Sequence, residues 1–218
     1  MSSPLVSASI LSWHAGRLEE AVIAMEQAGA DMIHFDIMDG QFVPPITFGA
    51  EVVRLVRTLT DLPFEAHLMT LTPEKHAAEF IDAGCMRVIF HSEATHHAAW
   101  LAGMIRDHGA EAGLAINPAT PAECVLAAAP VLDMALVMTV NPGWGGQSFL
   151  PWTLEKVRRI RESVPRLIVE VDGGMNAETA REAVASGASI LVSGSYVSRA
   201  TDRRAAMASL KGSSCGVP

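Results

Sequence analysis

The sequence predicts an α/β protein with the architecture of a (β/α)8 TIM barrel, and three observations support that fold class. Short apolar or β-branched runs alternate with longer segments of helical period along the whole chain. Eight such runs occur, and runs separated by helix-length segments pair in parallel, with the helices as crossovers. The rival fold, an open doubly wound sheet, should show a G-x-G-x-x-G turn after an early strand, and none stands there.

The predicted strands are rich in Val, Ile, Leu, Met and Phe, and in chain order they cover residues 5–10, 32–37, 64–68, 86–90, 112–116, 134–139, 167–171 and 190–192. The intervening segments carry apolar residues three and four apart and are predicted helices at residues 18–27, 51–58, 73–83, 96–108, 153–163, 177–186 and 203–210. Gly29, Gly84 and Gly187 follow three of these helices, where a left-handed residue is favoured. Pro73 and Pro121 occupy positions that the first turn of a helix tolerates.

Length and charge limit the classes of protein and partner. A chain of 218 residues with 50% hydrophobic residues suits one domain, 1–218, with a substantial core, and is too apolar for a disordered protein. Asp and Glu outnumber Lys and Arg 24 to 16, which argues against nucleic acid or an anionic membrane as the partner. We therefore expect a small ligand. Residues 211–218 are small and polar, and we expect them to fray.

The cysteines and the N-terminal segment predict a cytoplasmic protein. Cys85, Cys124 and Cys215 are odd in number and far apart, which argues against a disulfide framework or a thiolate zinc site and for a reducing compartment. The first residues have neither the basic region nor the long apolar region of a signal peptide. No apolar run approaches the roughly 20 residues that a membrane helix needs.

Four ionisable residues at the ends of predicted strands form a candidate metal site. Functional residues of such a barrel lie at the C-terminal ends of its strands, which brings His34, Asp36, His67 and Asp172 to one mouth. His34 and Asp36 are two apart and therefore share a face of their strand. A single inward His is usually a hydrogen-bonded core residue and a single Asp a helix cap, but four together favour a site. We expect His91, which ends the fourth predicted strand, to stand behind this cluster.

The donor types also indicate which ion would bind. Two imidazoles and two carboxylates suit one divalent ion such as Zn²⁺, Mn²⁺, Fe²⁺ or Co²⁺ rather than Ca²⁺ or Mg²⁺.

Glycine-rich segments follow the last three predicted strands, at residues 141–147, 172–174 and 193–195. Glycine lets backbone N–H groups approach an anion, and a phosphate site built late in the barrel is a recurrent arrangement. One such segment alone is usually just a turn, but three on the expected strands predict a phosphate cradle. Because residues 140–151 and 170–177 contain no Lys or Arg, backbone amides would carry most of the recognition.

Several motifs together resemble the ribulose-phosphate 3-epimerase family. They are Ser9-Ile-Leu-Ser, His34-Phe-Asp-Ile-Met-Asp-Gly-Gln-Phe-Val-Pro, His67-Leu-Met, Asn117-Pro-Ala-Thr-Pro, Val137-Met-Thr-Val-Asn-Pro-Gly-Trp-Gly-Gly-Gln and Glu170-Val-Asp-Gly-Gly, in order over almost the whole chain. The resemblance implies a ribulose-phosphate-binding (β/α)8 barrel. Its expected activity is the metal-dependent 3-epimerisation of D-ribulose 5-phosphate to D-xylulose 5-phosphate, a step of the pentose phosphate pathway. It also implies a cytoplasmic homo-oligomer, a dimer or a hexamer.

The resemblance assigns roles residue by residue. His34, Asp36, His67 and Asp172 would hold the metal ion, and Asp36 and Asp172 would double as the acid/base pair that inverts C3 through a cis-enediolate. The residues expected to contact substrate are Ser9, His67, Met38, Met69, Met138, Gly143, Trp144, Gly145, Gly146, Gly173, Gly174, Gly194 and Ser195.

Departures from the family pattern leave the substrate open. Trp13, His14, Gln41, Pro45 and Trp144 each differ from the residue that the family usually has, in loops that could face the sugar. The alternatives are therefore 3-epimerisation of D-allulose 6-phosphate or of a phosphorylated tetrulose. Two further possibilities are a non-catalytic phosphosugar-binding barrel, which would be expected to lack one of the four ligands, and a metal-free barrel of the decarboxylase or synthase type.

Overall fold

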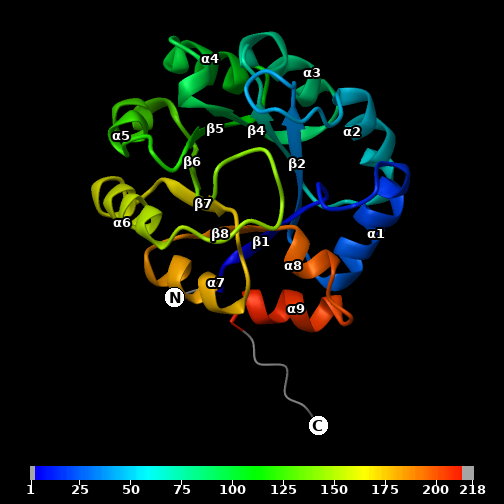
Figure 1. The fold of residues 1–218 in the computed structure, drawn as a ribbon. Coiled ribbons are helices and arrows are strands. Elements are labelled where there is room, and N and C mark those ends of the chain that lie inside the picture. Colours follow the sequence, from blue (N-terminus) through cyan, green and yellow to red (C-terminus); the bar gives the residue numbers. More distant parts are fainter. Residues whose placement is uncertain (1–2, 213–218) are drawn as a thin grey trace.

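Eight parallel strands close into a barrel in chain order in the computed structural model, which describes residues 3–212 (Figure 1). The strands are β1 Leu5–Ser9, β2 Met32–Met38, β3 Phe64–Met69, β4 Cys85–His91, β5 Glu111–Ile116, β6 Met134–Met138, β7 Ile168–Asp172 and β8 Ile190–Ser193. Each pairs with its sequence neighbours, and β1 pairs with β8 to complete the ring. The predicted fold class is confirmed.

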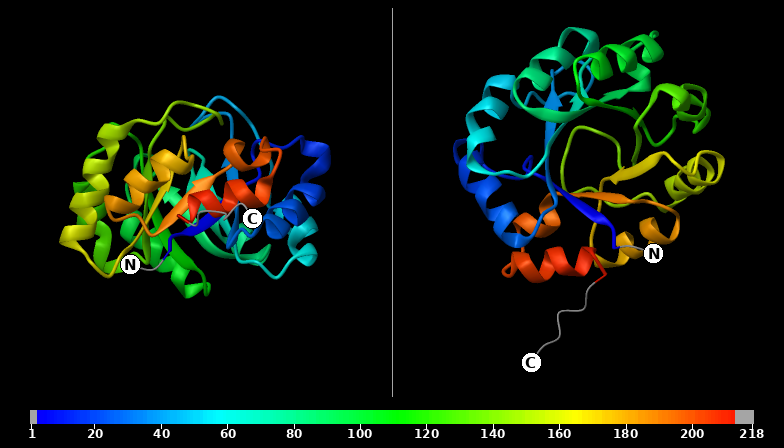
Figure 2. Two further views of the ribbon diagram at one scale, coloured as in Figure 1. Left: turned by 90° about the horizontal axis from the view of Figure 1, so that it is seen from below. Right: turned by 180° about the vertical axis from the view of Figure 1, so that it is seen from behind.

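Helices surround the barrel and return the chain from the end of one strand to the start of the next (Figures 1 and 2). They are α1 Leu18–Ala28, α2 Ala50–Val56, α3 Ala77–Asp82, α4 Ala98–Asp107, α5 Glu123–Ala128, α6 Leu154–Ser163, α7 Ala177–Ala185, α8 Ser195–Ser198 and α9 Arg203–Leu210. Short 3-10 helices, η1 Ala15–Arg17, η2 Arg57–Leu59, η3 Pro73–Lys75, η4 Ser92–Ala94, η5 Ala129–Val131 and η6 Pro151–Thr153, flank several of them.

The predicted elements agree closely with the observed ones. Every strand begins and ends within one residue of its predicted bounds. The predicted helix at 73–83 is divided into η3 and α3 at His76, which has φ −110°. Neither α5 nor α8 is among the predicted helices, because both are short and neither shows a full helical period of apolar residues; only Pro121, as a residue of a first helical turn, pointed to α5.

Side chains alternate along the strands between two environments. Phe35 faces outward and packs against Phe64 and Phe48, with ring centroids 4.9 and 6.1 Å away. His34 and Asp36, one residue to either side of it, face the barrel interior, as the two-residue period of a strand requires. The outer layer of apolar side chains packs the helices against the barrel, while the inner layer combines the polar residues with a separate apolar cluster that includes Ile89, Leu136 and Met138.

Two loops meet over the C-terminal ends of the strands. The loop after β6 arches across the mouth and reaches the loop after β2, and the side view shows both at the same end of the barrel (Figure 2). An ideal Cβ at Gly143 would lie 3.5 Å from Cβ of Val43 and 3.7 Å from Cδ of Pro45. The mouth is therefore covered from two sides.

Three further observations bear on the expectations for the chain as a whole. Within residues 3–212, no helix is long and apolar enough to cross a membrane. Cys85 is buried and Cys124 exposed, both as free thiols, and Cys215 lies outside the described residues. Of the predicted frayed tail, Lys211 donates hydrogen bonds to the carbonyl of Gly29 and to Asp31, while residues 213–218 lie outside the described residues.

Candidate active site

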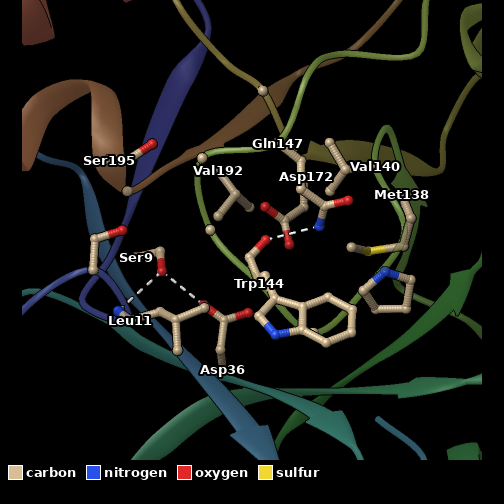
Figure 3. Close-up of a pocket in the computed structure, with 18 of the residues that line it drawn as sticks. Ser9, Leu11, Asp36, Met138, Val140, Trp144, Gln147, Asp172, Val192 and Ser195 are labelled. Carbon is tan, nitrogen blue, oxygen red and sulfur yellow. Dashed lines mark hydrogen bonds between the residues drawn. The ribbon is translucent and has the colours of Figure 1, made fainter. Parts of the chain in front are cut away.

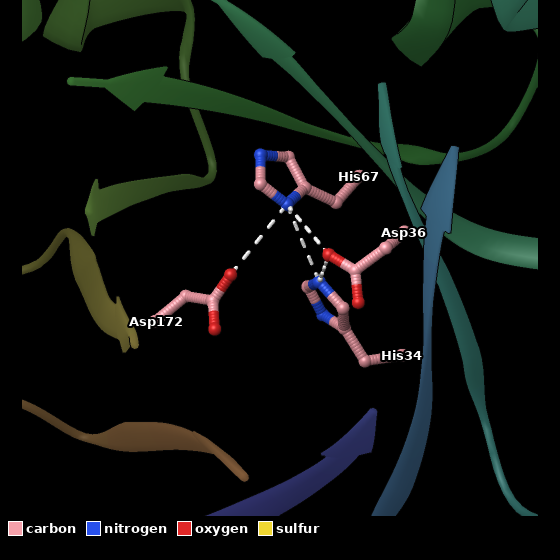
Figure 4. Close-up of side chains that lie close together, drawn as sticks. All are labelled: His34, Asp36, His67 and Asp172. Carbon is pink, nitrogen blue, oxygen red and sulfur yellow. Dashed lines mark hydrogen bonds and ion pairs between the residues drawn. The ribbon is translucent and has the colours of Figure 1, made fainter. Parts of the chain in front are cut away.

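Four donor atoms converge at the mouth of the barrel from three strands (Figure 4). They belong to His34 and Asp36 on β2, His67 on β3 and Asp172 at the end of β7, and all lie within 4.8 Å of one another. Nδ1 of His67 is 3.4 Å from Nε2 of His34, 3.4 Å from Oδ1 of Asp36 and 3.8 Å from Oδ2 of Asp172. The two carboxylates reach this point from opposite sides.

The surrounding residues orient two of these donors. Ser9 Oγ donates to Oδ2 of Asp36 (2.7 Å), so that Oδ1 is the oxygen that faces the imidazoles. Nδ1 of His34 donates to Oε1 of Glu65 (2.8 Å), so that Nε2 faces the cluster. A carboxylate behind a ligand histidine fixes its tautomer and ring orientation, which is the usual arrangement at metal sites.

The residues present fit a divalent metal ion. Both imidazoles turn one nitrogen toward the same point, and that point also receives one oxygen from each of two carboxylates. Two nitrogens and two oxygens at such spacing form a donor set for a borderline ion such as Zn²⁺, Mn²⁺, Fe²⁺ or Co²⁺. The sequence-predicted ligands are therefore brought together in space.

The two carboxyl groups differ in their protonation. Burial would raise the pKa of Asp36, but the neighbouring His34 and His67 imidazoles hold that pKa well below its usual range. Burial, and then the negative charge of Asp36, raise the pKa of Asp172 to about 7. Near neutral pH one carboxyl group is thus ionised while the other holds a proton for part of the time.

A buried charged layer lies directly beneath the cluster, and the sequence reading missed it. Arg87 on β4 donates to Oε2 of Glu65 (2.8 Å) and to Glu111 (2.6 Å), and lies 4.0 Å from Glu170 on β7. Burial and the nearby Glu65 carboxylate raise the pKa of Glu170 well above its usual value. The sequence carried a signal for this layer, because Glu65 and Glu170 each stand two residues before a predicted ligand and so share its face.

A pocket opens above the donor cluster and includes nearly all residues expected to contact substrate (Figure 3). Its wall contains Ser9, Met38, Met69, Met138, Gly143, Trp144, Gly145, Gly146, Gly173, Gly174, Gly194 and Ser195, together with Asp36 and Asp172. His67 is absent from this wall because its side chain is fully buried behind it. Its Nδ1 nevertheless faces the other three donor residues.

The three glycine-rich segments come together on one side of this pocket. A Cβ at Gly173 would lie 2.4 Å from Val140, and one at Gly174 would lie 2.8 Å from the backbone nitrogen of Phe149. Both residues have positive φ, 120° and 68°, so space and backbone conformation each require glycine here. The segment after β7 is therefore packed directly against the chain after β6.

Ser12 is a candidate binding residue that the sequence reading did not single out. Its hydroxyl would lie 3.1 Å from a Cβ at Gly145 and 3.4 Å from one at Gly194, which places it between two of the glycine segments. Ser12 also lines the pocket, and no hydrogen bond of its hydroxyl is found within residues 3–212. The signal was available in the motif Ser9-Ile-Leu-Ser, where a second serine follows the strand end.

Positive side chains contribute little to the pocket wall. Neither Lys nor Arg lines it among the described residues. Arg199, which directly follows α8 and lies outside the pocket wall, approaches the glycine segment at residues 141–147. Its guanidinium nitrogens lie 3.9 and 4.0 Å from the position of a Cβ at Gly146.

Four of the five departures from the family pattern lie away from the pocket wall. The guanidinium carbon of Arg203 lies over the ring of Trp13, 5.1 Å from the ring centroid. His14 caps η1, because its side chain accepts a hydrogen bond from the N–H of Gly16. Gln41 and Pro45 are also outside the wall, whereas Trp144 lines it. Of the five departures, Trp144 is therefore the one whose position lies in this pocket.

Fold and site together define a (β/α)8 barrel with a candidate metal centre at the C-terminal ends of its strands. The model of the ribulose-phosphate 3-epimerase family matches residues 5–198. The chain belongs to the ribulose-phosphate 3-epimerase family, and the resemblance seen in its motifs is confirmed.

Two relatives illustrate the similarity in sequence. A protein of Mycobacterium tuberculosis (strain H37Rv) named ribulose-phosphate 3-epimerase is 42% identical over 212 residues, which cover 95% of this chain and 92% of the relative. A protein of Bacillus subtilis (strain 168) with the same name is 40% identical over 213 residues, covering 95% and 98%. The prediction of an enzyme of this family agrees with these relatives.

Solved structures confirm the barrel. A 3-hexulose-6-phosphate synthase superposes with a TM-score of 0.75 at 18% identity, covering 97% of this chain and all of that one. The protein KGPDC of Streptococcus mutans superposes with a TM-score of 0.71 at 18% identity, covering 97% of each chain. At such low identity these likenesses show the fold alone.

Proposed function

We propose that this protein is a metal-dependent 3-epimerase that interconverts D-ribulose 5-phosphate and D-xylulose 5-phosphate. One observation carries the proposal: Asp36 and Asp172 reach a shared set of donor atoms from opposite sides, directly below a pocket that the glycine segments enclose. Inversion at a carbon needs a proton removed from one face and returned to the other. Two carboxyl groups on opposite sides meet that need.

The different protonation states of Asp36 and Asp172 support one of them as the base and the other as the acid, with these roles reversed for the other epimer. Ionised Asp36 accepts the C3 proton of one epimer, and protonated Asp172 delivers a proton to the opposite face. The other epimer requires the reverse arrangement. Ser9 holds Oδ2 of Asp36 throughout, so that the carboxylate does not rotate away from the reacting carbon.

The metal ion, held by His34, Asp36, His67 and Asp172, would supply Lewis acidity that makes a C3 proton beside the C2 carbonyl easier to remove. Three buried methionines, Met38, Met69 and Met138, line the pocket next to these residues. Their apolar and polarisable side chains exclude water from the reacting carbon.

The glycine segments and Ser12 are proposed to bind the phosphate group. Their backbone N–H groups stand in a wall without Lys or Arg among its described residues, so that neutral donors would provide most of the contacts. Ser12 adds a hydroxyl that is free to donate. This arrangement accounts for the binding of a dianion by a chain whose formal net charge is −8.

The test is proton exchange followed by NMR in D₂O, with a panel of tetrulose, pentulose and hexulose phosphates. We expect deuterium at C3 and formation of the C3 epimer, fastest with the pentulose phosphate, and loss of both after treatment with a chelator. Retention of full activity in freshly chelated, metal-free protein would contradict the metal requirement. Faster turnover of D-allulose 6-phosphate or of a tetrulose phosphate would reassign the substrate, and exchange with none of them would favour a non-catalytic barrel.

We further propose that the protein acts in the cytoplasm as a homo-oligomer, a dimer or a hexamer, as the family resemblance implies. The free thiols of Cys85 and Cys124 support a reducing compartment. Light scattering coupled to size-exclusion chromatography measures the oligomeric state, and a monomer at all concentrations would contradict the proposal.

A further inference from the structure

We infer that His91 and Glu93, held by the loop at residues 117–120, position His67 by determining which of its ring nitrogens carries the proton. This inference rests on the proposed metal centre, because a ligand nitrogen must present a lone pair to the ion. It concerns residues outside the donor set and outside the pocket wall. His91 and Glu93 are therefore positioning residues that act through His67.

The hydrogen-bond chain has a defined direction. Nε2 of His67 and Nε2 of His91 lie 2.8 Å apart between two fully buried rings, so one of them must donate and the other accept. Nδ1 of His91 lies 3.2 Å from Oε2 of Glu93, and a carboxylate oxygen accepts. His91 therefore carries its proton on Nδ1 and accepts at Nε2, which makes Nε2 of His67 the donor.

The consequence for His67 concerns its other nitrogen. With the proton on Nε2, Nδ1 keeps its lone pair, and Nδ1 is the atom that faces His34, Asp36 and Asp172. The opposite tautomer would place a hydrogen in the space between the donor atoms and would leave two buried lone pairs facing each other at 2.8 Å. The chain from Glu93 thus prepares His67 for metal binding before any ion arrives.

The positions of the rings are restrained by packing as well. The rings of His67 and His91 lie edge to edge, with their Nε2 atoms facing each other, centroids 5.0 Å apart and planes 25° from parallel. Phe42, from the loop after β2, also packs against His91, with a centroid distance of 4.7 Å. An aromatic ring at position 91 therefore has a packing role that is separate from its role as a hydrogen-bond acceptor.

Glu93 is itself anchored from a different part of the fold. Its Oε1 accepts from the N–H of Asn117 (2.8 Å) and from the hydroxyl of Thr120. Lys156 on α6 then donates to the carbonyls of Asn117, Pro118 and Thr120 at 2.8, 3.0 and 3.2 Å. The motif Asn117-Pro-Ala-Thr-Pro had no assigned role in the sequence. In the structure its residues hold Glu93, and through His91 they support the candidate ligand His67.

The two ligand histidines are supported separately. His34 is backed directly by Glu65, whereas His67 is connected to Glu93 through the intervening His91. A change at position 91 should therefore affect the His67 contribution and leave the His34–Glu65 pair intact. Loss of such a supporting partner typically weakens metal affinity by about 10- to 100-fold.

The experiment measures the tautomer and the metal affinity without using catalysis. In the wild-type protein, ¹⁵N NMR of the imidazole rings should show His67 protonated at Nε2 and His91 protonated at Nδ1. Zn²⁺ affinity is then measured by competition with a chromophoric chelator in the wild type, in His91→Phe and in His96→Phe. The phenylalanine at position 91 keeps an aromatic ring for packing and removes the acceptor, while His96 is exposed and serves as the matched control.

We expect His91→Phe to bind Zn²⁺ about 10- to 100-fold more weakly than the wild type and His96→Phe to bind it equally well, with unchanged circular dichroism in both. Wild-type affinity in folded His91→Phe would overturn the inference. So would a His67 ring protonated at Nδ1 in the wild type, a measurement that decides the matter even where the variant folds poorly. Failure of the wild type to bind Zn²⁺ or to epimerise any ketose phosphate would refute the proposed function but leave the tautomer measurement readable.

Discussion

The hydroxyl of Ser9 donates a hydrogen bond to Oδ2 of Asp36 (2.7 Å) and accepts one from the N–H of Leu11 (3.2 Å). Ser9 is the last residue of β1, and Asp36 lies in the adjacent strand β2. One oxygen of the carboxylate is thus fixed by the neighbouring strand, while the other faces His34 and His67. The orientation of the Asp36 carboxylate, the candidate base, therefore depends on the register between β1 and β2.

Ser9→Ala is expected to lower kcat by about tenfold or more, because a hydrogen bond to a charged group is worth roughly 1.5–3 kcal/mol. The metal content and the circular dichroism should stay unchanged. Steady-state kinetics checks this, with Ser186→Ala at the C-terminal end of α7 as a control. Equal kinetics for Ser9→Ala and the wild type would show that Ser9 does not orient Asp36.

Asp172→Asn is expected to lower the rate of epimerisation by about 10²- to 10⁴-fold, because an amide cannot carry the proton that the second face of C3 requires. The fold should remain intact. NMR in D₂O measures the loss of inversion, and Zn²⁺ content measured in parallel separates loss of the acid from loss of the ion. Normal turnover by this variant would contradict the assignment of two carboxyl groups as acid and base.

Ser12→Ala is expected to raise KM for the ketose phosphate several-fold with little change in kcat, because one neutral hydrogen bond contributes about 0.5–1.5 kcal/mol. Inhibition by inorganic phosphate should weaken by a similar factor, since both ligands would use the same hydroxyl. A lower kcat with unchanged KM would place Ser12 near the reacting carbon instead of the phosphate.

Gly174→Ala is expected to destabilise the protein by about 1–3 kcal/mol and to raise KM, because φ at this position is positive and the new Cβ would collide with the backbone of Phe149. Gly103→Ala, within α4, is the matched control: nothing lies within 4 Å of its Cβ position, and alanine there should stabilise by about 0.5–1 kcal/mol. Urea unfolding measures both, and the two variants should move in opposite directions.

The stability of the protein should depend on Glu93 in acid. Burial would raise the pKa of Glu93, but hydrogen bonds from His91, Thr120 and the N–H of Asn117 lower it to about 2, from a usual value of 4.5. The ionised carboxyl group therefore stabilises the fold above about pH 4.5, and this contribution is lost as the pH falls toward 2. Urea unfolding of wild type and Glu93→Gln should show a stability difference that shrinks from pH 6 to about pH 3, and a difference independent of pH would be contrary to this assignment.

The sequence was sufficient to predict the barrel and the positions of the donor residues for one physical reason. In a parallel barrel, the C-terminal ends of all strands meet at one mouth, so knowing where β2, β3 and β7 end was enough to bring His34, His67 and Asp172 together. The roles of these residues remain predictions, whereas their convergence is a feature of the structure.

Other features depend on contacts that no local pattern encodes. His67 is fully buried and absent from the pocket wall, whereas Met69, two residues further along β3, lines it; the motif His67-Leu-Met does not reveal this difference. Ser12 lies beside Gly145 and Gly194 only because the chain ends of β1, β6 and β8 are brought together by closure of the barrel. Arg87 and Glu65 were visible as charges inside apolar strands, but their pairing required the register between β3 and β4.

The close approach of the loop at Gly143 to Val43 and Pro45 has a consequence for isotope exchange in the proposed reaction. While the two loops touch, a proton taken from C3 in the proposed reaction would share a small volume with the substrate and would have little bulk water to exchange with. Because Asp36 takes this proton and Asp172 supplies the one that enters the product, the proton would return from Asp36 only when the reaction reverses. The fraction of label kept by the recovered starting epimer would therefore measure how long the loops stay together relative to the chemical step. Under the proposed function, label retained in the starting epimer would therefore serve as a clock for the opening of the mouth.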